Sequence, residues 1–124
     1  MKLRIRGNSI RLRLTQSEVS QLAAEGHVEN AISFGNSELR YIIASVGDEQ
    51  KLNADFRDNE IVIYVPAADV RKWAASEQVG IEARQTVDEG DLHILIEKDF
   101  ACLKPREGED DADTYAHPHA AGNG

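Results

Sequence analysis

The sequence lacks the features that mark secreted, membrane-spanning and disulfide-rich proteins. Its 124 residues include a single cysteine, Cys102, which excludes an intrachain disulfide framework and fits a reducing compartment. No apolar run approaches the roughly 20 residues that a membrane-spanning helix needs, and residues 1–6 alternate in polarity where a signal peptide has an apolar stretch. We therefore expect a cytoplasmic protein with no membrane contact.

The chain also lacks an excess of positive charge. It has 14 Lys and Arg residues against 22 Asp and Glu residues, a formal net charge of −8, which argues against nucleic acid as the partner because phosphate contacts need a basic surface. The charges are unevenly placed, since acids crowd residues 107–113 and five cations precede the first acid. These cations are Lys2, Arg4, Arg6, Arg11 and Arg13.

Local patterns predict alternating hairpins and short helices. Apolar and charged residues alternate over residues 2–14 on both sides of a turn at Gly7, as in a hairpin with one buried face. Thr15 and Glu18 have the spacing of a capping box, so a helix should begin there, and Gly26 is placed to end it. A second hairpin follows, which completes a strand-strand-helix-strand-strand (ββαββ) unit.

The second half of the chain repeats this plan. Asn8 and Asn59, and likewise Val19 and Val70, are identical residues 51 positions apart, at matching turn and helix positions. The sequence thus predicts an internal duplication, with units 1–46 and 51–100 in a single domain of residues 1–100. We expect an α+β fold in which about eight mainly antiparallel strands form one curled or barrel-like sheet with two short helices. Residues 101–124 form an acidic C-terminal tail.

Two stretches carry a resemblance to a known family. Residues 6–11 with 14–19, and residues 96–100 with the Cys102-Leu103 pair and a later Glu-Asp-Asp, resemble a family of small bacterial proteins of unknown function. The resemblance covers nearly the whole chain and implies a stand-alone bacterial protein. It implies no activity, substrate or catalytic residue.

The five N-terminal cations share one side of the first hairpin and admit three interpretations. They could bind an anion such as a nucleotide, a polyphosphate or an acidic partner, because arginine forks match phosphate and carboxylate geometry. They could equally be a solvated sheet face that keeps an edge from aggregating. The third interpretation has the acidic tail folding back over them, with Phe100, Leu103 and Tyr115 as apolar anchors.

One strand of the second half is apolar on both sides. Val62 and Tyr64 occupy the positions where the first unit has Arg11 and Arg13, and a strand of this kind is usually covered on both faces. A homodimer or packing of the tail is favoured over a ligand here. The candidates for an interface or for tail packing are Val62, Tyr64, Phe100, Leu103 and Tyr115.

No group of residues points to catalysis. His117 and His119 are weak metal candidates whose spacing matches no closed site, and Cys102 lacks a base beside it. We expect no cofactor and a non-enzymatic binding or assembly module that acts through contacts with a protein partner or by self-association. The alternative is a protein that binds or processes an anionic or phosphate-containing small molecule on the basic face.

Overall fold

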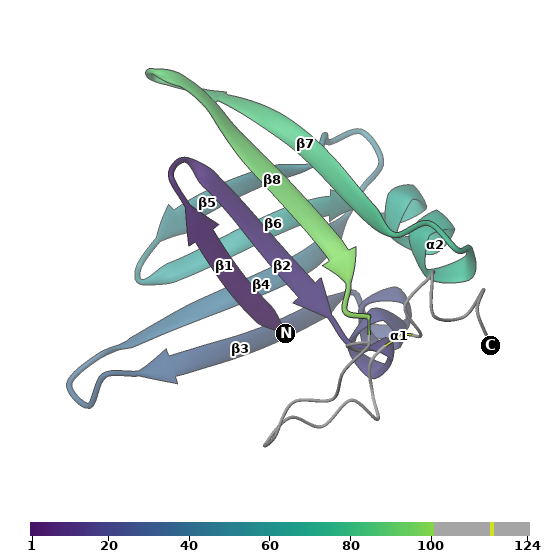
Figure 1. The fold of residues 1–124 in the computed structure, drawn as a ribbon, viewed down its shortest axis with the longest axis horizontal. Coiled ribbons are helices and arrows are strands. Elements are labelled where there is room, and N and C mark those ends of the chain that lie inside the picture. Colours follow the sequence, from purple (N-terminus) through teal and green to yellow (C-terminus); the bar gives the residue numbers. More distant parts are fainter. Residues whose placement is uncertain (101–114, 116–124) are drawn as a thin grey trace.

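The computed structural model describes residues 1–100 and residue 115. Residues 1–100 form eight strands and two helices (Figure 1). The elements are β1 (Lys2–Arg6), β2 (Ser9–Leu14), α1 (Gln16–Glu25), β3 (His27–Ser33), β4 (Glu38–Val46), β5 (Asn53–Arg57), β6 (Glu60–Pro66), α2 (Ala67–Ala75), β7 (Gly80–Val87) and β8 (Gly90–Lys98). The predicted α+β class, with two short helices, is confirmed.

The strands form two separate four-stranded sheets, with the orders β1-β2-β8-β7 and β3-β4-β6-β5. In each sheet two antiparallel hairpins meet along a central parallel pair, which is β2 with β8 in one sheet and β4 with β6 in the other. Each half of the chain therefore supplies one hairpin to each sheet. The origin of this arrangement in a duplication stays a prediction.

The expectation of one curled or barrel-like sheet is wrong, because the described strands form two sheets that do not close into a barrel. Each helix connects a strand of one sheet to a strand of the other, so the two hairpins of one half do not extend a single sheet. Antiparallel pairing is still the commoner kind, in four of the six strand pairs.

A side chain links the two sheets where the edge strands β5 and β7 approach each other. The Oε1 atom of Gln85 accepts a hydrogen bond from the N–H of Ala54 at 2.6 Å, and its Nε2 atom donates to the carbonyl oxygen of Ala54 at 3.0 Å. The amide of Gln85 thus occupies the position that the backbone of a neighbouring strand would take in a closed barrel.

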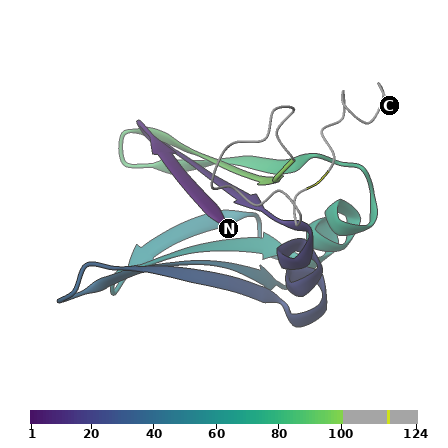
Figure 2. The same ribbon diagram turned by 60° about the horizontal axis from the view of Figure 1, so that its bottom comes forward.

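The core lies between the sheets and beneath the helices. Both helices lie at one end of the sheets, whereas the hairpin turns lie at the other (Figures 1 and 2). Trp73 of α2 is fully buried, and its indole N–H donates to the carbonyl oxygen of Val79 at 3.1 Å. The buried apolar residues are Ile10, Leu12, Leu14, Val19, Leu22, Val28, Ile43, Ile63, Val65, Val70, Trp73, Ile94 and Ile96.

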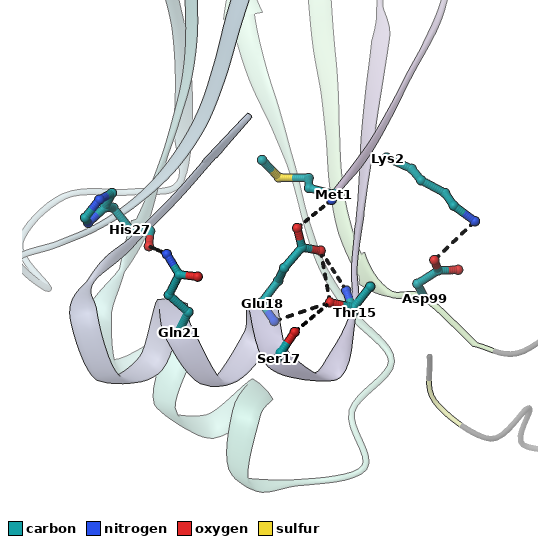
Figure 3. Close-up of polar contacts among 8 residues, drawn as sticks. All are labelled: Met1, Lys2, Thr15, Ser17, Glu18, Gln21, His27 and Asp99. Atoms are coloured by element: carbon teal, nitrogen blue, oxygen red, sulfur yellow. Dashed lines mark hydrogen bonds and ion pairs between the residues drawn. The ribbon is translucent and has the colours of Figure 1, made fainter. Parts of the chain in front are cut away.

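Helix α1 begins and ends as its sequence predicts. The N–H of Glu18 donates to Oγ1 of Thr15 at 3.4 Å, and the N–H of Thr15 donates to Oε1 of Glu18 at 2.9 Å (Figure 3). Gly26 ends the helix with a φ of 87°, a left-handed conformation that favours glycine, and its N–H donates to the carbonyl oxygen of Leu22 at 3.0 Å. Glu18 also pairs with the amino group of Met1, so the residue before β1 is held at the first turn of α1 (Figure 3).

Candidate functional site

The five N-terminal cations lie together on the outer face of the sheet that contains β1 and β2. In the antiparallel register Lys2 faces Arg13 and Arg4 faces Arg11, while Arg6 faces Ser9. Residues directly opposite in such a pair lie on the same side of the sheet. The alternate residues of β2 are buried in the core, so the cations point away from it.

Two carboxylates, one on β8 and one on the residue after it, form ion pairs with three of these cations. Oε1 of Glu97 lies 2.9 Å from Nε of Arg13 and 3.4 Å from Nε of Arg11. Oδ2 of Asp99 lies 3.3 Å from Nζ of Lys2 (Figure 3). Within the described part of the chain, no ion pair involves Arg4 or Arg6.

Two shallow hollows lie among the cations. One, of about 140 Å³, is lined by Arg4, Arg6, Ser9 and Arg11. The other, of about 230 Å³, is lined by Lys2, Leu3, Arg4, Arg11 and Arg13. Arg4 lines both hollows, Arg6 lines the first, and neither pairs with a carboxylate of the described chain. The positive charge that is free to meet a ligand therefore lies at Arg4 and Arg6.

A larger apolar cleft opens between the two sheets near the hairpin turns. Its volume is about 520 Å³. Its apolar lining includes Ile5, Ile10, Leu39, Ala54, Phe56, Ile61, Val87 and Leu92. Ile5 on β1 is 61% exposed and Phe56 on β5 is 65% exposed, which is unusual for large apolar residues on the inner sides of strands. Gln85, which links the two sheets, also lines the cleft.

Val62 and Tyr64 lie on the outer face of the second sheet. Val62 is beside Ile42 of β4, and Tyr64 is beside Ala44. Both side chains are half-buried, as is Ile42. The structure therefore brings these two candidates together on one face, and it separates them from the cations, which lie on the outer face of the other sheet.

Phe100 and Tyr115 contact each other just beyond the end of β8. Their ring centroids lie 5.8 Å apart, and the N–H of Tyr115 donates to the carbonyl oxygen of Asp99 at 2.7 Å. The Nζ atom of Lys98 lies 5.3 Å from the centroid of the Tyr115 ring, close enough for a cation–π interaction. The chain thus returns to the domain at Tyr115. Leu103, His117, His119 and Cys102 lie outside the described residues.

Lys98 is a buried cation that the sequence did not single out. Lys98 is the last residue of β8 and is 5% exposed. Its Nζ atom donates to the carbonyl oxygen of Ser76 at 2.7 Å. Burial lowers the pKa of the Lys98 ammonium below its usual range, and the negative charge of Glu77 opposes part of that shift. The contact of Lys98 with Ser76 joins the end of β8 to the loop after α2, and its contact with Tyr115 joins it to the C-terminal segment.

The described residues contain neither a cluster of metal ligands nor a helix suited to cross a membrane. Among residues 1–100 and 115, no three His, Cys, Asp or Glu side chains come together as the ligands of a metal ion would. In the same part of the chain, neither helix has the length and apolar composition to cross a membrane.

The sequence-based reasoning missed the cleft and the ion pairs of Glu97. Ile5 and Phe56 occupy apolar positions of alternating strands, a pattern that also describes buried core residues, so nothing local distinguishes them. Glu97 alternates with Ile94 and Ile96, which predicts an outward side chain but not its neighbours, because the pairing of β8 with β2 joins residues more than 80 positions apart.

Comparisons with known proteins identify a family but no similar curated protein or solved structure. A search of curated proteins and a search of solved structures each returned no match. A family model does match, over residues 1–119, so the similarity continues past β8 and includes most of the C-terminal segment. The chain belongs to this family, a family of unknown function termed DUF7009.

Proposed function

We propose that the protein is a non-enzymatic binding module that holds a protein partner in the apolar cleft between its two sheets. The observation that carries this proposal is the exposure of Ile5 and Phe56, which come from different sheets and line the same 520 Å³ cleft. Exposed apolar side chains that gather in one concave place are typical of interaction sites. The proposed location is the cytoplasm, because a single cysteine suits a reducing compartment.

The lining of the cleft favours a protein partner over a small polar substrate. Its side chains are mainly aliphatic or aromatic, and Gln85 uses its amide on Ala54. The one charged residue of the lining, Asp55, is paired, because its Oδ2 lies 2.8 Å from Nη2 of Arg57. An apolar centre with a polar rim is the common arrangement of protein interfaces.

Phe56 should contribute a measurable share of the affinity. Burial of a whole phenylalanine side chain stabilises by about 1.5–3 kcal/mol, and Phe56 is 65% exposed, so most of its surface is available for burial by a partner. Phe56→Ser should therefore weaken binding by about 1–2 kcal/mol, or roughly five- to thirtyfold in Kd.

A peptide selection with a matched control tests the proposal. Short random peptides displayed on phage are selected on the wild-type protein, and each enriched peptide is then titrated by fluorescence anisotropy. Phe34→Ser is the control, because Phe34 is also 65% exposed but does not line the cleft. We expect Phe56→Ser to weaken binding and Phe34→Ser to leave it within twofold. Enriched peptides that bind Phe56→Ser as tightly as the wild type would contradict the proposal.

Anion binding on the basic face is the second candidate function. The specific observation in its favour is that Arg4 and Arg6 line a hollow with Ser9 and Arg11 and pair with no carboxylate of the described chain. Inorganic polyphosphate or a nucleotide should then raise the melting temperature of the wild type at low salt, but not that of Arg4→Gln/Arg6→Gln. Absence of any stabilisation by these anions would remove this candidate.

A further inference from the structure

Strand β1 is an open edge of its sheet. It pairs with β2 on one side, and no described strand pairs with its other side (Figure 1). Arg6 and Ser9 flank the two-residue turn and hydrogen-bond to each other's backbones, so hydrogen-bonded pairs recur at every second residue of β1. The backbone N–H and C=O groups of Leu3 and Ile5 therefore point away from β2 in the plane of the sheet, where an added strand could bind them.

The two sides of β1 differ sharply in chemistry. Lys2, Arg4 and Arg6 lie on its outer side, and the latter two have no carboxylate partner in the described chain. Leu3 and Ile5 lie on its inner side, and Ile5 is part of the lining of the apolar cleft. A strand added along this edge would continue both surfaces at once, one cationic and the other apolar.

Edge strands β5 and β3 do not offer the same combination. The outward N–H and C=O groups of Ala54 on β5 are already bonded to Gln85 of β7. Strand β3 carries Glu29, Ala31 and Ser33 on its outer side and so presents no row of cations.

From these observations we infer that β1 accepts, as an added strand, an extended segment of another protein in which acidic and apolar residues alternate. This inference rests on the proposed function and names the chemistry of the partner. Alternate residues on one side of a strand are about 7 Å apart in both partners, so acids at every second position would align with Arg4 and Arg6. The apolar residues between them would face Leu3, Ile5 and the cleft.

Charge argues against the other occupants of this edge. If β1 paired with β1 of a second copy, a cation would oppose a cation in every register that keeps the apolar sides together, and like charges directly opposite are destabilising. Single-stranded nucleic acid would need aromatic side chains for base stacking, and the face formed by the alternate residues of β1, β2 and β8 has no Phe, Tyr or Trp among the described residues. Its one imidazole, that of His93, lies 2.7 Å from a carboxylate oxygen of Glu82.

The test uses synthetic peptides and the full-length protein. The probe is a fluorescent peptide of alternating Glu and Val, and the control has the same composition with all Glu residues before all Val residues. Anisotropy titrations at low salt give both affinities, and amide hydrogen exchange is followed at Leu3 and Ile5. We expect the alternating peptide to bind at least tenfold more tightly and to slow exchange at both amides. Equal affinities, or unchanged exchange at Leu3 and Ile5, would overturn the inference.

A charge swap tests the pairing with the arginines. Arg4→Glu/Arg6→Glu should weaken binding of the Glu peptide by about tenfold and strengthen binding of a peptide of alternating Lys and Val. Lys51→Glu/Arg71→Glu is the matched control, because it makes the same change in net charge at exposed cations away from β1 and outside the cleft lining, and it should leave both affinities unchanged. Equal effects of the two double variants would show long-range electrostatics only and would overturn the inference.

The outcomes separate this inference from the proposed function. Peptides from the random selection that depend on Phe56 but not on Arg4 and Arg6 would support the cleft as a binding site and overturn the role of β1. A change in dimerisation between the wild type and Arg4→Glu/Arg6→Glu, measured by light scattering, would identify a second copy as the occupant and would also overturn it.

Discussion

Replacement of Gln85 with alanine should weaken the junction where β5 of one sheet meets β7 of the other. The change removes the hydrogen bonds of 2.6 Å and 3.0 Å that the side chain makes with Ala54. A hydrogen bond contributes about 0.5–1.5 kcal/mol net, and the backbone groups of half-buried Ala54 would regain only part of their hydration. We expect Gln85→Ala to lower the free energy of unfolding by about 2 kcal/mol, which corresponds to about 10 °C in melting temperature for a domain of this size.

Urea unfolding followed by the fluorescence of Trp73 is a suitable assay, because this tryptophan is the only one in the chain and is fully buried. Gln85→Met keeps most of the side-chain volume and removes the hydrogen bonds, so it should be nearly as destabilising as Gln85→Ala. Gln21→Ala is the control, since Gln21 makes one exposed hydrogen bond of 3.3 Å to the carbonyl oxygen of His27 (Figure 3).

The reasoning would be refuted if Gln85→Ala and Gln85→Met both unfolded within about 0.5 kcal/mol of the wild type, the range expected of neutral surface changes. The two sheets would then be held together by the core and helices alone. If only Gln85→Ala were destabilised, packing of the side chain would account for the effect, and the hydrogen bonds to Ala54 would contribute little.

Three further predictions concern the cap, the buried cation and the returning C-terminal segment. Thr15→Ala removes the acceptor for the N–H of Glu18 and should lower the free energy of unfolding by about 1 kcal/mol in urea, whereas Thr15→Ser should restore it. Burial lowers the pKa of Lys98 in the folded state, so between that pKa and 10.5 the unfolded chain binds more protons. The stability of the wild type relative to Lys98→Met should therefore rise with pH in that window, and a flat difference would contradict the assignment. Tyr115→Ala removes the ring beside Phe100 and should cost about 2 kcal/mol in thermal unfolding, most of which Tyr115→Phe should recover. An unchanged midpoint for Tyr115→Ala would show that the contact does not stabilise the domain.

Features that depend on neighbours in sequence could be predicted well. The capping box of Thr15 and Glu18, the end of α1 at Gly26 and the alternation of the first hairpin all arise from groups within a few residues of one another. The same alternation predicted that the cations of β1 and β2 share one face, because a hairpin with a short turn fixes which residues are opposite.

Features that depend on partners far along the chain could not be predicted in this way. Every hairpin here has an apolar side that could pack on any other, so alternation does not specify that β2 pairs in parallel with β8 or that β4 pairs with β6. The single barrel-like sheet was the simplest arrangement of eight such strands, and it was wrong because each helix leads the chain into the other sheet.

The sequence is thus enough to predict the elements, the two ends of α1 and the composition of each strand face, since local hydrogen bonds and side-chain alternation set these. Only the tertiary structure decided which cations keep their charge free, because Glu97 reaches Arg11 and Arg13 through the pairing of β8 with β2 and leaves Arg4 without a partner in the described chain. It also decided that Ile5 and Phe56 meet at one cleft, since they belong to different sheets whose relative position no local pattern specifies.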